Sequence, residues 1–214
     1  MKTILCFGDS NTWGWVPTSP VGPGRYAKDE RWTGVLRQQL GEGYDIVEEG
    51  LNGRTTVWDD PVEEIMSGKA YLTPCLTSHM PIDLVILMLG TNDLKQRFSV
   101  PASDIADAAG LLVRIIQKSE VGPDGGPPKV LLLAPPPLGK LTELEQMFAG
   151  GAEKSKLLGE QFQRVADLLG CSFFNTGEVI VSSDIDGVHL EADAHLKLGH
   201  RLAEIVREIF EGNS

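Results

Sequence analysis

Five short stretches of the chain are almost continuously apolar or β-branched, the pattern of strands that are covered on both faces of a sheet. We predict these strands at Thr3–Phe7, Tyr44–Glu48, Asp83–Leu89, Lys129–Pro135 and Cys171–Asn175. Runs of this kind are typical of a parallel sheet, in which helices shield both faces from water.

Amphipathic segments alternate with these strands and predict helices at Arg31–Leu40, Ala102–Lys118, Ala152–Gly170 and Glu191–Phe210. A shorter helix is expected at Ala70–Thr77, with Pro74 in its first turn. The alternation predicts an α/β fold, a three-layer α/β/α sandwich around a five-stranded parallel sheet. The sequence has no internal repeat and no linker-like tract, so we expect residues 1–214 to form a single domain.

The charge balance limits the partners of the protein. The 214 residues carry a formal net charge of −11, which argues against nucleic acid or an anionic membrane surface as a partner. No apolar run approaches the length of a membrane span. The three cysteines, Cys6, Cys75 and Cys171, are odd in number and far apart, so we expect buried free thiols and a cytoplasmic location.

A polar, glycine-containing block follows each of the first three predicted strands, and a fourth such block precedes the last predicted helix. They are GDS at 8–10, GLNGRTT at 50–56, GTND at 90–93 and DIDGVH at 184–189. In an open α/β sheet, ligands bind at the carboxyl ends of the strands, where the strand order reverses. We therefore expect the four blocks to meet at one edge of the sheet.

These blocks contain the groups that acyl transfer requires. Ser10 is a candidate nucleophile, His189 a base that takes its proton, and Asp186 a carboxylate that orients the imidazole. The backbone N–H groups of Ser10 and Gly53 and the side-chain amide of Asn92 are candidate oxyanion donors. Taken singly, Ser10 could be a helix cap and Gly53 a turn glycine.

The four blocks, in this order, resemble those of the SGNH hydrolases, also called GDSL esterases. The stretches TWGWVP, RWTGVL, EEGL and LGTND further resemble the arylesterase and acyltransferase branch of that family. The resemblance implies a flavodoxin-like sheet, the triad Ser10–Asp186–His189, and an oxyanion hole of Ser10, Gly53 and Asn92. The family usually has Leu where this chain has Asn11, which puts the shape of the acyl pocket in question.

Several further residues are candidates for the substrate pocket. Trp13 and Trp15 follow the nucleophile and either pack the first helix on the core or wall the acyl pocket, and Val188 precedes the histidine. Asp9 and Asp93 are expected to orient loop backbone near the site.

Other polar residues are given structural roles. Arg54 is expected to pair with an acid between subunits, although a substrate carboxylate is an alternative partner. His79 is expected to cap a helix or to bond a carbonyl, and His195 and His200 to face solvent. We expect no metal site, since no Cys/His/Asp spacing matches a known ligand set, and no cofactor.

The leading functional hypothesis is a serine esterase that cleaves short-chain aryl or alkyl esters, with some acyl transfer to alcohols. An O-acetylated sugar is the alternative substrate. A non-catalytic flavodoxin-like binding module is the alternative of another class, and a phosphate-binding module is disfavoured because no phosphate-loop motif follows the first strand.

Two loops are longer than the fold requires, Val16–Glu30 and Pro135–Gly151. The second is rich in apolar residues: Leu138, Leu141, Leu144, Met147 and Phe148. Such a loop either covers its own site as a lid or contacts another subunit. Because members of the arylesterase branch form oligomers, the resemblance favours a homo-oligomer.

Overall fold

The computed structural model of the protein describes residues 1–17 and 24–212. Five strands form one parallel sheet in the order β2-β1-β3-β4-β5. Their bounds are β1 Lys2–Gly8, β2 Tyr44–Gly50, β3 Leu84–Met88, β4 Lys129–Ala134 and β5 Ser172–Asn175. Each lies within two residues of its predicted position, so the α/β prediction and the parallel sheet are confirmed.

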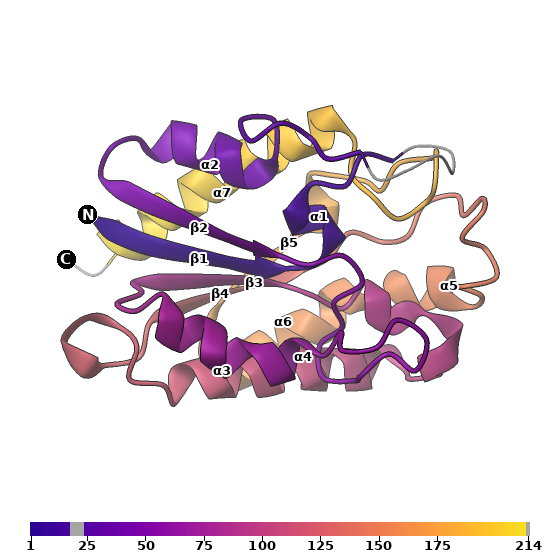
Figure 1. Ribbon diagram of the computed structural model, residues 1–214, viewed down its shortest axis with the longest axis horizontal. Helices are drawn as coiled ribbons and strands as arrows, with labels where there is room; N and C mark the ends of the chain where they lie inside the picture. Colours follow the sequence, from indigo (N-terminus) through magenta and orange to yellow (C-terminus); the bar gives the residue numbers. More distant parts are fainter. Residues whose placement is uncertain (18–23, 213–214) are drawn as a thin grey trace.

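Helices cover both faces of the sheet (Figure 1). On one face lie α2 (Trp32–Leu40) and α7 (Ala192–Glu211), and on the other α3 (Gly68–Ser78), α4 (Ala102–Gln117) and α6 (Leu158–Leu169). The remaining helices are short: α1 Ser10–Trp13, α5 Gly151–Ser155, and the 3-10 turns η1 Asn92–Leu94, η2 Gln96–Phe98, η3 Pro123–Gly125 and η4 Thr176–Glu178. Fully buried apolar side chains fill both interfaces, for example Trp32 and Leu198 on one face and Ile105 and Phe162 on the other. Among the described residues, no helix is both long and apolar enough to span a bilayer.

Two predicted helices differ from the observed ones. Helix α3 begins at Gly68 because the Ser67 hydroxyl accepts a hydrogen bond from the Ala70 N–H at 3.4 Å. Pro74 therefore lies in the middle of the helix and not in its first turn. The segment predicted as one helix at Ala152–Gly170 is divided into α5 and α6, with residues 156–157 between them.

The prediction for His195 is wrong, since its side chain is fully buried between α7 and α2. The Trp32 N–H donates to its Nδ1 at 3.3 Å, and the Tyr26 ring contacts it edge-on. Burial lowers the pKa of His195 to about 4, so the ring is neutral and serves as a packed core group. His200 is exposed, as predicted, and His79 is the residue that follows the last turn of α3.

The strand order reverses at β1, which lies between β2 and β3. The carboxyl end of β1 is therefore the point at which an open α/β sheet places its ligand. Helix α1 begins two residues beyond β1, at this edge of the sheet (Figure 1).

The three cysteines are all free, as predicted. Cys6 and Cys75 are buried, and Cys171 is partly exposed. Residues 18–23 of the first long loop lie outside the described residues.

Candidate active site

Ser10 is the first residue of α1 and is nearly buried. The Asp9 carboxylate caps this short helix by accepting the Asn11 N–H at 2.9 Å. Residue 8 must be glycine, because a Cβ there would lie 2.1 Å from the Thr12 hydroxyl oxygen. The tight strand-to-helix turn thus fixes the direction of the Ser10 side chain. Burial raises the pKa of Asp9 to about 6.

Ser10, His189 and Asp186 form a hydrogen-bonded row. His189 Nε2 lies 3.0 Å from Ser10 Oγ, and His189 Nδ1 lies 2.7 Å from Asp186 Oδ2. Asp186 Oδ1 accepts the backbone N–H groups of Val188 and His189 at 2.8 and 2.9 Å. Burial acts to raise the pKa of Asp186, but the hydrogen bond and charge of His189 hold it below the usual value. The carboxylate therefore stays ionised beside the imidazole.

Asn11 connects α1 to the loop that carries the histidine. Its side chain is 2% exposed, and its amide brackets His189: Nδ2 donates to the Val188 carbonyl at 3.2 Å, and Oδ1 accepts the Leu190 N–H at 3.1 Å. Asn11 is not among the residues that line the cavity beside Ser10. The departure from the usual Leu thus affects the position of His189 and not the wall of the pocket.

Trp15 stacks on His189, with ring centroids 5.3 Å apart and planes 23° apart. The indole lines the cavity beside Ser10 and can stabilise the imidazolium that forms during proton transfer. Val188 also lines this cavity. Trp13 does not: it lies against the Arg25 guanidinium, 4.6 Å from its ring, so its assignment to the substrate pocket is corrected.

The candidate oxyanion donors face the same cavity, which Ser10, Gly53 and Asn92 all line. Asn92 Nδ2 donates one hydrogen to the Arg54 carbonyl at 3.1 Å, which leaves its second hydrogen for a ligand. Gly53 has a φ of 81°, a backbone conformation that favours glycine.

Buried polar contacts hold the oxyanion loop from behind. Asp93 accepts the N–H of Thr56 at 3.0 Å and also its hydroxyl, as the role predicted for Asp93 requires. Burial raises the pKa of Asp93 to about 6. Arg54 contradicts its predicted pairing between subunits: it is buried, donates to the carbonyls of Gly8 and Glu49, and lies over the Phe7 ring.

The cavity beside Ser10 measures about 220 Å³ and has an apolar and a polar wall. Trp15, Leu144, Met147, Phe148 and Val188 form the apolar wall, and Asn52, Glu63 and Lys95 join the oxyanion residues on the polar one. Three of the apolar residues come from the loop after β4, whose side chains pack on the core of the same chain. The loop therefore covers its own site.

A charged network that the sequence analysis missed supports the polar wall. Lys95 contacts Asp60 at 3.3 Å and Glu63 at 2.8 Å, and Arg97 contacts the same two carboxylates at 2.8 and 3.4 Å. In the sequence these residues look like solvated loop charges. Only the approach of the loop before α3 to the residues after β3 brings them to the cavity.

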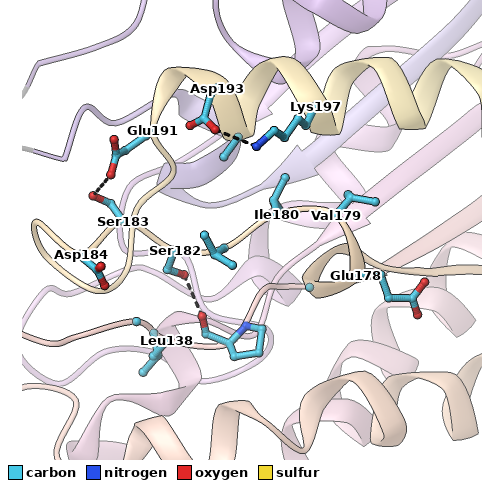
Figure 2. Close-up of a pocket in the computed structure, with 15 residues that line it drawn as sticks. Leu138, Glu178, Val179, Ile180, Ser182, Ser183, Asp184, Glu191, Asp193 and Lys197 are labelled. Atoms are coloured by element: carbon cyan, nitrogen blue, oxygen red, sulfur yellow. Dashed lines mark hydrogen bonds and ion pairs between the residues drawn. The ribbon is translucent and has the colours of Figure 1, made fainter.

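A second and larger cavity, about 830 Å³, borders the segment from Ser182 to Asp184 that precedes the catalytic Asp186 (Figure 2). It is lined by residues after β4, after β5 and at the start of α7, and none of Ser10, Asp186 and His189 borders it. Ser183 donates its hydroxyl to Glu191 here at 2.7 Å, while its N–H donates to the His189 carbonyl at 2.8 Å. These contacts tie the segment before Asp186 to His189 and to the start of α7.

Three solved structures that resemble this chain carry esterase names. Est24, a carbohydrate acetylesterase from Sinorhizobium meliloti, is 43% identical and superposes with a TM-score of 0.94 over 98% of this chain and 100% of that one. The aryl esterase of M. smegmatis is 43% identical, with a TM-score of 0.93 over 97% of this chain and 99% of that one. A further carbohydrate acetylesterase family member from S. meliloti is 38% identical, with a TM-score of 0.91 over 98% and 99% of the two chains.

The family assignment rests on sequence as well as on structure. No curated protein matches the chain significantly. The sequence profile of the GDSL-like lipase/acylhydrolase family matches residues 6–200, which span the four blocks from GDS to DIDGVH. With the hydrogen-bonded row of Ser10, His189 and Asp186, this match shows that the chain belongs to the GDSL-like lipase/acylhydrolase family and is a carboxylic ester hydrolase.

Proposed function

We propose that the protein cleaves short-chain carboxylic esters through an acyl intermediate on Ser10. The observation that carries this proposal is the row in which His189 Nε2 is 3.0 Å from Ser10 Oγ and Nδ1 is 2.7 Å from Asp186. A serine hydroxyl is a weak nucleophile until a base in hydrogen-bond reach takes its proton.

In the first half-reaction, Ser10 Oγ bonds to the carbonyl carbon as its proton passes to His189 Nε2. The N–H groups of Ser10 and Gly53 and the free amide hydrogen of Asn92 hold the oxyanion. Collapse breaks the bond to the alcohol oxygen, which leaves with the proton from His189. In the second half, His189 takes a proton from water as the water oxygen bonds to the acyl carbon. Collapse then breaks the bond to Ser10 Oγ, which regains the proton from His189 and releases the acid, and Asp186 and Trp15 stabilise the imidazolium in both halves.

The size of the cavity supports a preference for short acyl groups. Its 220 Å³ lies below the range of about 300–1,000 Å³ typical of sites for larger ligands. Leu144, Met147 and Phe148 close it with apolar surface. The same surface excludes water, so small alcohols compete with water for the acyl-serine and some acyl transfer follows.

Two further properties belong to this proposal. We propose a homo-oligomer, supported by Val62 and Ile65, which are 72% and 80% exposed on the loop that carries Glu63. We also propose a cytoplasmic location, supported by the three free thiols.

The polar wall favours acetylated sugars as a second candidate substrate. Asn52 Oδ1 is buried and has no hydrogen-bond partner among the described residues. Glu63 Oε2 lies against Gly53, 2.6 Å from the position that a Cβ would occupy there. Lys95 and Arg97 bind the other carboxylate oxygen of Glu63, Oε1. Both free oxygens accept hydrogen bonds, so they fit an alcohol that carries further hydroxyl groups.

An ester panel tests the proposal. We expect 4-nitrophenyl acetate and butyrate to be cleaved far faster than the octanoate, and added alcohol to yield some transferred ester. Glu63→Gln should lower kcat/KM on a monoacetylated sugar by roughly 10- to 100-fold, the effect of about 1.5–3 kcal/mol for a hydrogen bond to a charged group. The aryl acetate should be little affected, and Glu143→Gln, at an exposed position, should affect neither substrate. A preference for the octanoate would contradict the short-acyl proposal, and equal losses on both acetates would reject Glu63 as a specificity residue.

A further inference from the structure

A second chemical cluster lies at the end of β2, outside the catalytic cavity. Glu49, Cys75 and His79 bring one carboxylate oxygen, one thiol and one imidazole nitrogen within 4.8 Å of one another. Cys75 and His79 are four residues apart at the end of α3, so they lie on one face of the helix. Glu49 comes from the neighbouring strand, and this is why the spacing of the sequence did not reveal the set.

From this arrangement we propose a binding site for a divalent metal ion of the zinc class, with Cys75 Sγ, His79 Nε2 and Glu49 Oε1 as its three protein ligands. Three protein ligands and a water are a common zinc coordination. Sulfur and imidazole nitrogen select zinc-like ions, whereas Mg²⁺ and Ca²⁺ require oxygen ligands.

The geometry needs only small movements. In a tetrahedral zinc site with bonds of about 2.0–2.3 Å, the ligand atoms lie about 3.3–3.8 Å apart. His79 Nε2 and Glu49 Oε1 are now 2.8 Å apart in a hydrogen bond, so they must separate by less than about 1 Å. Their side chains are 32% and 19% exposed, which gives an ion a path from solvent, while Cys75 closes the inner side.

The electrostatic balance also permits a cation. The Arg54 guanidinium is the positive neighbour of Glu49 and Cys75, but it is held between the Phe7 and Tyr71 rings and donates to backbone carbonyls. With the thiol proton displaced by the metal, the ligands carry two negative charges, which outweigh the positive charge of Arg54. His79 also follows the last turn of α3, the end of a helix at which cations are favoured.

Cobalt serves as the spectroscopic probe. The full-length protein, freed of metal with a chelator, is titrated with Co²⁺, and the near-ultraviolet thiolate-to-cobalt absorption is recorded. We expect one Co²⁺ per chain, displaced by Zn²⁺ and not by Mg²⁺. Cys75→Ser and His79→Gln should abolish the band, while Cys171→Ser and His200→Gln, which change the same residue types elsewhere, should retain it.

The melting temperature gives an independent readout, because a ligand that binds only the folded chain stabilises it. Zn²⁺ should raise the melting temperature of the native chain in a saturable way and should not raise that of His79→Gln, whose partly exposed side chain can change without loss of folding. Absence of the cobalt band, its persistence in Cys75→Ser, its loss in Cys171→Ser, or displacement by Mg²⁺ would overturn the proposal. Since these readouts do not use the esterase reaction, they are independent of the proposed function.

Discussion

Replacing Asn11 by Leu removes both hydrogen bonds by which α1 holds the histidine loop. The native amide donates to the Val188 carbonyl at 3.2 Å and accepts the Leu190 N–H at 3.1 Å, so His189 is fixed on both sides. Leu has a similar volume, and the change therefore removes polar contacts without opening a large cavity. It also introduces the residue that the family usually has at this position.

The expected size of the effect follows from the burial of these groups. Each of the two hydrogen bonds makes a net contribution of about 0.5–1.5 kcal/mol to the free energy of unfolding, and a buried partner left unsatisfied costs about 1–3 kcal/mol. Partial relaxation of the loop gives a loss of about 2–4 kcal/mol in the free energy of unfolding, or roughly 4–16 °C in melting temperature for a chain of this size. If about 1.4 kcal/mol of this loss is the free energy needed to bring His189 back to its catalytic position, kcat falls about tenfold.

Steady-state kinetics on 4-nitrophenyl acetate and thermal unfolding measure both effects. We expect kcat to fall while KM changes little, because the amide acts through His189 and does not border the cavity. The matched control is Thr176→Val, which removes the buried hydrogen bond from the Thr176 hydroxyl to the Ala134 carbonyl, away from the histidine loop. It should lower the melting temperature and leave kcat unchanged. A native kcat in Asn11→Leu, or an equal loss in the control, would refute the positioning role.

Three further predictions concern charge. Asn92→Ala should lower kcat on aryl acetates by roughly 100- to 1,000-fold with a smaller change in KM, since an oxyanion donor acts in the transition state, and a change in KM alone would contradict this. Burial raises the folded pKa of Asp93 from 3.8 to about 6, so ionised Asp93 destabilises the fold and stability falls as pH rises from about 4 to 6, by up to about 3 kcal/mol. Urea unfolding of Asp93→Asn should show a smaller decline, because Asp9, whose pKa burial also raises to about 6, still contributes one. An unchanged pH dependence would exclude Asp93 as a source. Finally, kcat/KM should fall towards acid pH, because only an unprotonated base can accept the Ser10 proton; a rate that is constant or rises towards acid pH would argue against a histidine base.

The fold and the central groups of the site could be predicted because local patterns encode them. Continuous apolar runs specify buried parallel strands, and the polar blocks that carry the chemistry follow strand ends or precede the last helix. Ser10 and Asn92 follow β1 and β3, and His189 precedes α7, so the topology of the sheet brings them together although they are far apart in the chain.

The errors have a common physical origin, which is packing between distant segments. His195 looks like a surface residue of an amphipathic helix until α2 covers it. In the sequence, Arg54 looks like a surface side chain that could pair with another subunit. In the structure, the carbonyls at the ends of β1 and β2 accept its hydrogen bonds. Glu63 and Lys95 carry no sequence signal at all, since their roles depend on how two loops meet.

The central claim is that Ser10 forms the acyl intermediate, and mass spectrometry of the trapped enzyme tests it directly. Acid quenching during turnover of 4-nitrophenyl butyrate should reveal a chain heavier by one butyryl group, with the added mass on the peptide that contains Ser10. Ser10→Ala, folded by circular dichroism, should carry no acyl group and should lose nearly all turnover, because the triad acts as a unit. Acylation at a different residue, such as Ser182 or Ser183 of the neighbouring loop, or native turnover by Ser10→Ala, would contradict the account.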